Sequence, residues 1–181
     1  MHDPADVQRE YRSMYACFLR ELQEHVQRTQ PRKIVIAGFG NGPELPVLTR
    51  AAPAARVVAV DNDETAIAGG WRRYGSDGSR NVLFLNADVR SELVQQEFKD
   101  AHLIVAFFIL HLLGDSNRVS GKWFDLAPQP SYLALADWCA PDPCIIDERW
   151  TPLGENRYGF RTTNPNNPRT TSAALRIVEK A

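Results

Sequence analysis

The chain has 181 residues, of which 44% are hydrophobic and 24% are charged, and its formal net charge is -1. This length suits one ordinary domain, and the composition predicts a water-soluble globular protein. A near-zero charge without a polybasic run argues against nucleic acid, and no apolar run approaches the ~18 residues of a membrane span. The polar, acidic start "MHDPADVQREY" is unlike a secretion signal, so we expect a cytoplasmic protein.

A long amphipathic helix is the first predicted element. Between residues 4 and 29, apolar side chains recur on one helical stripe opposite Gln, Arg and Glu, and the helix should end near Pro31. Apolar, β-branched runs then predict four buried strands, at 33–37, 56–60, 81–85 and 102–108. Helical patterns lie between them, at 43–52, 63–74 and 91–98. This alternation predicts a parallel sheet with right-handed crossovers.

The second half of the chain is predicted more coarsely. A turn-rich stretch at 114–130 is expected to be a loop, 131–139 a helix and 143–150 a fifth strand. Two short tail strands follow, roughly at 157–162 and 174–179. We therefore predict one domain, with a helical lid over 1–30, a core over 31–150 and a strand pair over 151–181.

A glycine-rich turn follows the first strand. Gly38, Gly40 and Gly42 alternate and are followed by Pro43. Such a turn lets the backbone pass close to a cofactor. The dinucleotide fingerprint has a glycine at the sixth motif position, where Pro43 stands, so the turn departs from the nicotinamide pattern. The proline is expected to serve the first turn of the next helix instead.

Acidic residues follow the next two strands. Asp61 ends the second strand, where a carboxylate can accept both hydroxyls of an adenosine ribose. Asp88 follows the third strand, where it can accept a hydrogen bond from an adenine amino group while neighbouring backbone amides bond the ring. The candidate cofactor-binding residues are Gly38, Phe39, Gly40, Gly42, Asp61, Asn62, Asp88 and Val89.

In "AGFGNG", "VVAVDND" and "LNADV" the chain resembles the S-adenosylmethionine-dependent methyltransferases with a Rossmann-like fold, over roughly residues 30–150. The resemblance implies an α/β fold with a doubly wound, mostly parallel sheet of seven strands, the last of them antiparallel. It also implies S-adenosylmethionine as cofactor, lying across the carboxyl ends of the first strands, and S-adenosylhomocysteine as product. A fainter similarity to the arginine methyltransferases does not imply arginine methylation, because His111 stands where their guanidinium-binding glutamate would be. A fainter similarity to nicotianamine synthase keeps transfer of the cofactor's aminocarboxypropyl arm open.

The fourth strand leads to the candidate catalytic and substrate residues, because the resemblance implies a methyl acceptor there. An imidazole at His111 can take the acceptor's proton, although a purely structural histidine is an equal alternative. The residues predicted to bind substrate are Tyr11, Tyr15, Phe108, His111 and Trp123. Aromatic walls favour a cationic sulfonium or amine through cation–π attraction. The three cysteines match no zinc or redox spacing, so no metal is expected.

Taken together, these features predict a methyltransferase for a small molecule, in a biosynthetic pathway of specialised metabolism. Three alternatives stay open. One is another use of S-adenosylmethionine, either aminocarboxypropyl transfer or intramolecular cyclisation. The second is a non-catalytic binding module, and the third is a truncated nicotinamide enzyme. A homodimer also stays open, and the sequence does not specify the acceptor or the attacked atom.

Overall fold

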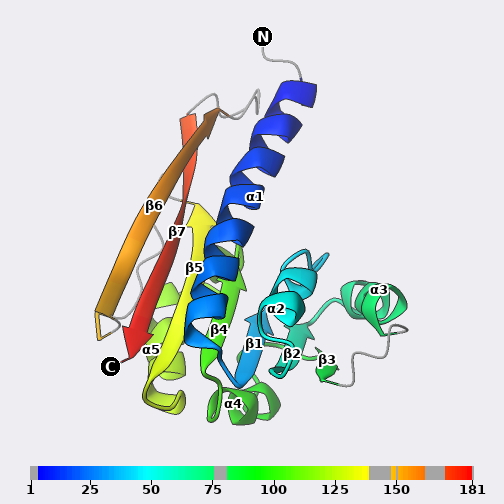
Figure 1. Cartoon of the computed structure of the whole chain (residues 1–181), viewed down its shortest axis with the longest axis vertical. Coiled ribbons are helices and arrows are strands. Elements are labelled where there is room, and N and C mark those ends of the chain that lie inside the picture. The colour runs from blue at the N-terminus through cyan, green and yellow to red at the C-terminus, as the bar shows by residue number, and fades with distance from the viewer. Residues whose placement is uncertain (1–3, 76–80, 139–147, 150, 162–169, 181) are drawn as a thin grey trace.

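One seven-stranded sheet organises the molecule, in the order β3-β2-β1-β4-β5-β7-β6 (Figure 1). The computed structural model describes residues 4–75, 81–138, 148–149, 151–161 and 170–180. The strands are β1 Lys33–Ala37, β2 Arg56–Asp61, β3 Val82–Asn86, β4 Leu103–Phe107, β5 Ser131–Trp138, β6 Thr151–Arg161 and β7 Thr170–Lys180. The helical elements are α1 Pro4–Thr29, α2 Leu45–Ala51, α3 Glu64–Tyr74, α4 Glu92–Phe98, the 3-10 turn η1 Leu110–Leu112 and α5 Ser116–Leu126.

Strand directions confirm the predicted fold class. The first five strands pair in parallel, and β7 runs antiparallel to both β5 and β6. The strand order reverses beside β1, which pairs with β2 on one edge and with β4 on the other. In open α/β sheets, ligands bind outside the carboxyl ends of the strands at such a reversal.

Alternation along the strands builds a separate core on each face of the sheet. Ile34 and Ile36 of β1 join a buried cluster with Phe18 of α1, whereas Val35 and Ala37 join another cluster with Phe98 of α4. Because successive side chains of a strand point to opposite faces, a strand covered on both sides must be apolar throughout. All five residues of β1 and all five of β4 are buried, so the helices form a layer on each face.

Helix α1 runs lengthwise over the face that also carries α2, and its long axis is evident in blue in Figure 1. Its bounds agree with the predicted helix over 4–29. Met14, Phe18, Leu22 and Val26 form its buried stripe. Among the helices that the structure describes, none has both the length and the apolar character needed to cross a bilayer.

The second half corrects two sequence predictions. Residues 131–138 form strand β5 instead of a helix, and the stretch predicted as a loop contains helix α5. Leu and Ala give "SYLALADW" a helical propensity, but pairing with β4 on one side and β7 on the other outweighs it. The strand predicted at 143–150 falls mostly outside the described residues. The two tail strands are confirmed, and both are longer than predicted.

Candidate functional site

The glycine turn after β1 is held against the end of β2. The backbone amides of Gly38 and Phe39 both donate to the carbonyl of Val60, at 3.0 and 2.8 Å. A Cβ added at Gly42 would lie 2.0 Å from Cε2 of Phe39, so this glycine makes room for the Phe39 ring. That ring is buried and packs edge-on against Phe84, at 5.4 Å between centroids. Phe39 and Gly42 therefore serve the core with their side-chain positions, and their amides are engaged within the protein, Phe39 with Val60 and Gly42 with the carbonyl of Phe39 at 2.8 Å.

Gly40 is the open point of the turn. It is exposed, its φ is 50°, and a Cβ added there would meet no atom within 4 Å. Its amide donates to Oδ2 of Asp61 at 2.7 Å. An accessible, left-handed backbone beside a carboxylate fits the approach of a cofactor, because no side chain covers the turn on that side.

Proline placement differs from the prediction. Pro43 precedes the N-cap residue Glu44, and it is Pro46 that occupies the first turn of α2. A proline is tolerated there because the first-turn amides of a helix have no partner within the helix. Pro43 instead lies on the wall of the larger pocket described below.

The two predicted acids line one small pocket of about 150 Å³, together with Asn62 and Val89. Asp61 accepts from the amide of Asp63 at 2.9 Å as well as from Gly40. Asp88 is paired with Arg90, whose guanidinium donates to Oδ2 at 2.6 Å. These hydrogen bonds hold the pKa of the Asp88 carboxyl below its ordinary value. The structure thus brings four of the predicted cofactor residues together.

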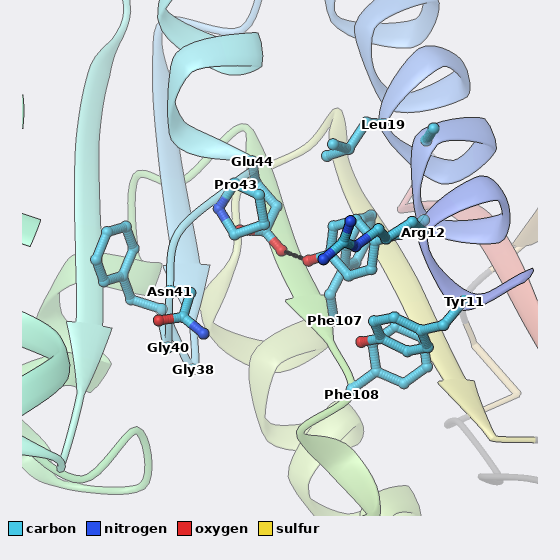
Figure 2. Close-up of a pocket in the computed structure, with 13 residues that line it drawn as sticks. Tyr11, Arg12, Leu19, Gly38, Gly40, Asn41, Pro43, Glu44, Phe107 and Phe108 are labelled. Atoms are coloured by element: carbon cyan, nitrogen blue, oxygen red, sulfur yellow. Dashed lines mark hydrogen bonds between the residues drawn. The ribbon is translucent and has the colours of Figure 1, made fainter. Parts of the chain in front are cut away.

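A larger pocket, of about 410 Å³, lies between α1, the glycine turn and the end of β4 (Figure 2). Tyr11, Tyr15 and Phe108, all predicted from sequence, line it. Their ring centroids lie 5.9 to 6.1 Å apart. Phe108 has a φ of 55°, which is rare for a residue with a bulky side chain and is a kind of strain found at functional sites.

Glu44 is a pocket residue that sequence reasoning missed. It lies at the N-cap of α2 and lines the larger pocket, but its side chain is only 4% exposed. The hydroxyl of Tyr15 donates to its Oε1, and the dashed line in Figure 2 marks this bond. Burial raises the pKa of the Glu44 carboxyl to about 7, although the Tyr15 hydroxyl and the residue's own amide lower it. In the sequence, Glu44 is indistinguishable from an ordinary acid at a helix start.

His111 forms a pair with a second residue that the sequence did not reveal. Its Nδ1 lies 2.7 Å from Oδ1 of Asp137, and its amide donates to Oδ2 at 3.2 Å. An ionised carboxylate only accepts hydrogen bonds, so in the neutral imidazole the proton is on Nδ1 and Nε2 carries the lone pair. Asp137 is 4% exposed near the end of β5. Because a helix was predicted over 131–139, the sequence did not place Asp137 at a strand end beside His111. His111 is not among the described residues that line the two pockets.

The structure places Trp123 elsewhere than the sequence analysis predicted. It was predicted to overhang the substrate from a loop, but it lies in α5 with a 2% exposed side chain. Its ring packs against Phe98 of α4 at 5.3 Å, in the core on the opposite face of the sheet from Tyr11 and Tyr15. The aromatic wall of the larger pocket therefore forms without it.

Comparison with known proteins gives matches in structure alone. No family model and no curated protein matches the sequence. The [4+2]-cyclase SpnF has a TM-score of 0.70 at 11% identity, over 88% of this chain and 80% of its own. A Bacillus halodurans C-125 protein provisionally named a methyltransferase has a TM-score of 0.69 at 11% identity, over 90% of this chain and 98% of its own.

A third similar structure contains ligands. It is coclaurine N-methyltransferase bound to N-methylheliamine and S-adenosylhomocysteine, with a TM-score of 0.65 at 11% identity, over 91% of this chain and 72% of its own. Identities this low relate folds, not activities. The strand order, the antiparallel β7 and these neighbours together show that the chain has the Rossmann-like fold of the S-adenosylmethionine-dependent methyltransferases.

Proposed function

We propose that this protein is an S-adenosylmethionine-dependent methyltransferase that acts on a small molecule of specialised metabolism. One contact carries the proposal, the 2.7 Å hydrogen bond from the Gly40 amide to Asp61. Gly40 lines the larger pocket and Asp61 lines the smaller one, so this bond joins the two across the glycine turn. A ligand with a nucleoside at one end and an amino-acid arm at the other suits a crevice of this form.

The residues around the turn have distinct roles in holding such a cofactor. Asp61 accepts two backbone hydrogen bonds, and because a carboxylate has roughly four lone-pair sites, capacity remains for ribose hydroxyls. Asp88 accepts from the amide, Nε and Nη2 of Arg90, so it is proposed to accept from the adenine amino group when the exposed Arg90 side chain shifts. Once bound, S-adenosylmethionine supplies a methyl group activated by a positively charged sulfur.

The glycine-turn side of the larger pocket is proposed to take the cofactor's amino-acid arm, and its aromatic side is proposed to take the acceptor. Tyr11, Tyr15 and Phe108 line that side, and holding the acceptor in line supplies much of the rate in a reaction of this kind. His111 is the proposed general base; it does not line the larger pocket, so an acceptor must extend beyond that pocket for Nε2 to take its proton, while Asp137 fixes the ring through Nδ1. A small-molecule acceptor is supported by the pocket's volume of about 410 Å³ and by the N-methylheliamine bound to the N-methyltransferase neighbour.

Calorimetry and product analysis test the proposal. We expect the protein to bind S-adenosylmethionine and S-adenosylhomocysteine in preference to NAD. Turnover of an acceptor should release S-adenosylhomocysteine. Binding of NAD alone would mean that Pro43 at the sixth motif position does not exclude a dinucleotide. Release of methylthioadenosine would rule out methyl transfer.

A second candidate is cyclisation of a small molecule without methyl transfer. The observation that favours it is the structural similarity to the [4+2]-cyclase SpnF. In that case the substrate would be converted to a cyclic isomer of equal mass, and no S-adenosylhomocysteine would accumulate. Mass spectrometry of the product separates the two candidates.

A further inference from the structure

We propose that a third pocket, next to the smaller pocket of Asp61 and Asp88, binds a small molecule that carries a phosphate group. Residues of α4, of α5 and of the segments that precede these helices line it, so it is called the α4–α5 pocket below. Its volume of about 340 Å³ is within the ordinary range of small-molecule sites. The wall combines three basic side chains with an apolar surface: Arg90, Arg118 and Lys122 with Leu113, Val119 and Trp123.

Two of the basic side chains have no partner. Arg118 and Lys122 are four positions apart on α5, and both are exposed. Among the described residues, neither side chain takes part in an ion pair or a hydrogen bond. Like charges at this spacing lie on the same face of a helix and repel each other, so the pair lowers the stability of α5. An anion bound between them replaces that repulsion with attraction.

The acid of the α4–α5 pocket does not neutralise these charges. Asp115 is the N-cap residue of α5, and its Oδ1 accepts from the amide of Arg118 at 3.0 Å. Three basic groups therefore face one acidic group here, although the whole chain has a formal net charge of -1. A phosphate carries up to two negative charges and three acceptor oxygens, so it matches this excess better than a carboxylate does.

Arg90 lines both the α4–α5 pocket and the smaller pocket. Its backbone is fixed, because its amide donates to Oδ1 of Asp88 and its carbonyl accepts from Nε2 of Gln95, each at 2.7 Å. Its side chain is exposed, and among the described residues the guanidinium pairs with Asp88 alone. The guanidinium can therefore exchange this carboxylate for a phosphate while the backbone stays in place.

This exchange couples the phosphate site to the proposed cofactor. When a phosphate draws the guanidinium of Arg90 away, Asp88 regains lone pairs that can accept from the adenine amino group. Cofactor binding in turn releases Arg90 toward the phosphate, because coupling between two sites is reciprocal. The effect should be only a few-fold, since exposed ion pairs are weak. The coupling rests on the proposed function, whereas the phosphate site does not.

Calorimetry with phenyl phosphate and phenol tests the phosphate site, because the two probes share a ring and differ in charge. Both are titrated at about pH 8, above the second phosphate pKa of about 6, into the wild type and Arg118→Gln/Lys122→Gln. The control is Arg20→Gln/Lys99→Gln, which makes the same changes at exposed positions outside the pocket. We expect the wild type and the control to bind phenyl phosphate about tenfold or more tightly than phenol. The Arg118→Gln/Lys122→Gln variant should lose most of this preference, and an equal preference in that variant, or none in the wild type, would overturn the site.

Titration of S-adenosylhomocysteine with and without saturating phenyl phosphate tests the coupling. The wild type should bind S-adenosylhomocysteine about two- to fivefold more tightly when the probe is present. Arg90→Gln should bind it more tightly without the probe and should not respond to the probe. An unchanged affinity in the wild type would overturn the role of Arg90, and competition between the two ligands would place the probe in the cofactor site instead and overturn the inference. Failure of the proposed function has a different signature, because the wild type would then bind neither S-adenosylmethionine nor S-adenosylhomocysteine but would still prefer phenyl phosphate to phenol.

Discussion

Replacing Glu44 with Gln should remove a pH dependence from the stability of the fold. Burial raises the pKa of this carboxyl from 4.5 to about 7. The two pKa values differ by about 2.5, and a difference of one corresponds to about 1.4 kcal/mol of folding free energy. Ionised Glu44 therefore destabilises the folded protein by about 3 kcal/mol. Gln has nearly the same shape and keeps a carbonyl oxygen that can accept from Tyr15, so the charge is the main thing that changes.

The sign follows from proton binding. Between pH 4.5 and about 7 the folded protein holds the Glu44 proton more tightly than the unfolded chain does. Stability from this group is therefore complete below pH 4.5 and is lost as the pH rises through about 7. Relative to the wild type, Glu44→Gln should gain up to about 3 kcal/mol in free energy of unfolding between pH 4.5 and pH 8.

Urea unfolding of both proteins across this pH range measures the difference directly. Buried His25, whose pKa is lowered to about 4, titrates in both proteins, so its contribution cancels in the comparison. Glu24→Gln is the matched control, because the same change at an exposed position of α1 should leave the pH profile unaltered. A constant offset between Glu44→Gln and the wild type from pH 4.5 to 8 would refute the reasoning.

The remaining predictions concern the cofactor turn and the histidine pair. Asp61→Ala should weaken S-adenosylhomocysteine binding by about 2 to 3 kcal/mol, since charge-assisted hydrogen bonds are lost, and an unaltered calorimetric affinity would contradict the ribose assignment. Gly42→Ala places a methyl group 2.0 Å from the Phe39 ring and should cost about 1 to 3 kcal/mol in urea unfolding. Gly40→Ala is its control, because it has a similarly positive φ but no atom within 4 Å; equal losses would show that packing is not the cause. Asp137→Asn should slow turnover by about tenfold or more and leave S-adenosylhomocysteine affinity unchanged, whereas unaltered kinetics would exclude His111 as base.

Much of the fold was predictable because its signals are local. Strands β1 and β4 are buried on both faces, so each is an unbroken apolar run that the sequence shows directly. The glycine turn and Asp61 were also predictable, since the turn follows β1 and Asp61 is the last residue of β2, and parallel strand ends meet at one edge of a sheet. The structure adds the hydrogen bond between Gly40 and Asp61, which no sequence pattern specifies.

The unpredicted parts depend on contacts between distant segments. Strand β5 carries helix-forming Leu and Ala, and only its two neighbours in the sheet make it a strand. Because of that error, the sequence analysis did not predict that Asp137 pairs with His111. Glu44 became notable only when α1 placed Tyr15 against it, 29 positions away in the chain. Trp123 was misplaced for the same reason, because it packs on Phe98 of another helix.

The hydrogen bond between Tyr15 and Glu44 also links α1 to the rest of the pocket wall. Helix α1 precedes the whole sheet in sequence, yet it supplies one side of the larger pocket. The pocket is therefore complete only while α1 is docked, and a ligand bound there must stabilise the docked state by mass action. Backbone amides of α1 that exchange with deuterium through local undocking will accordingly exchange more slowly with ligand present, by the factor that the ligand's occupancy sets.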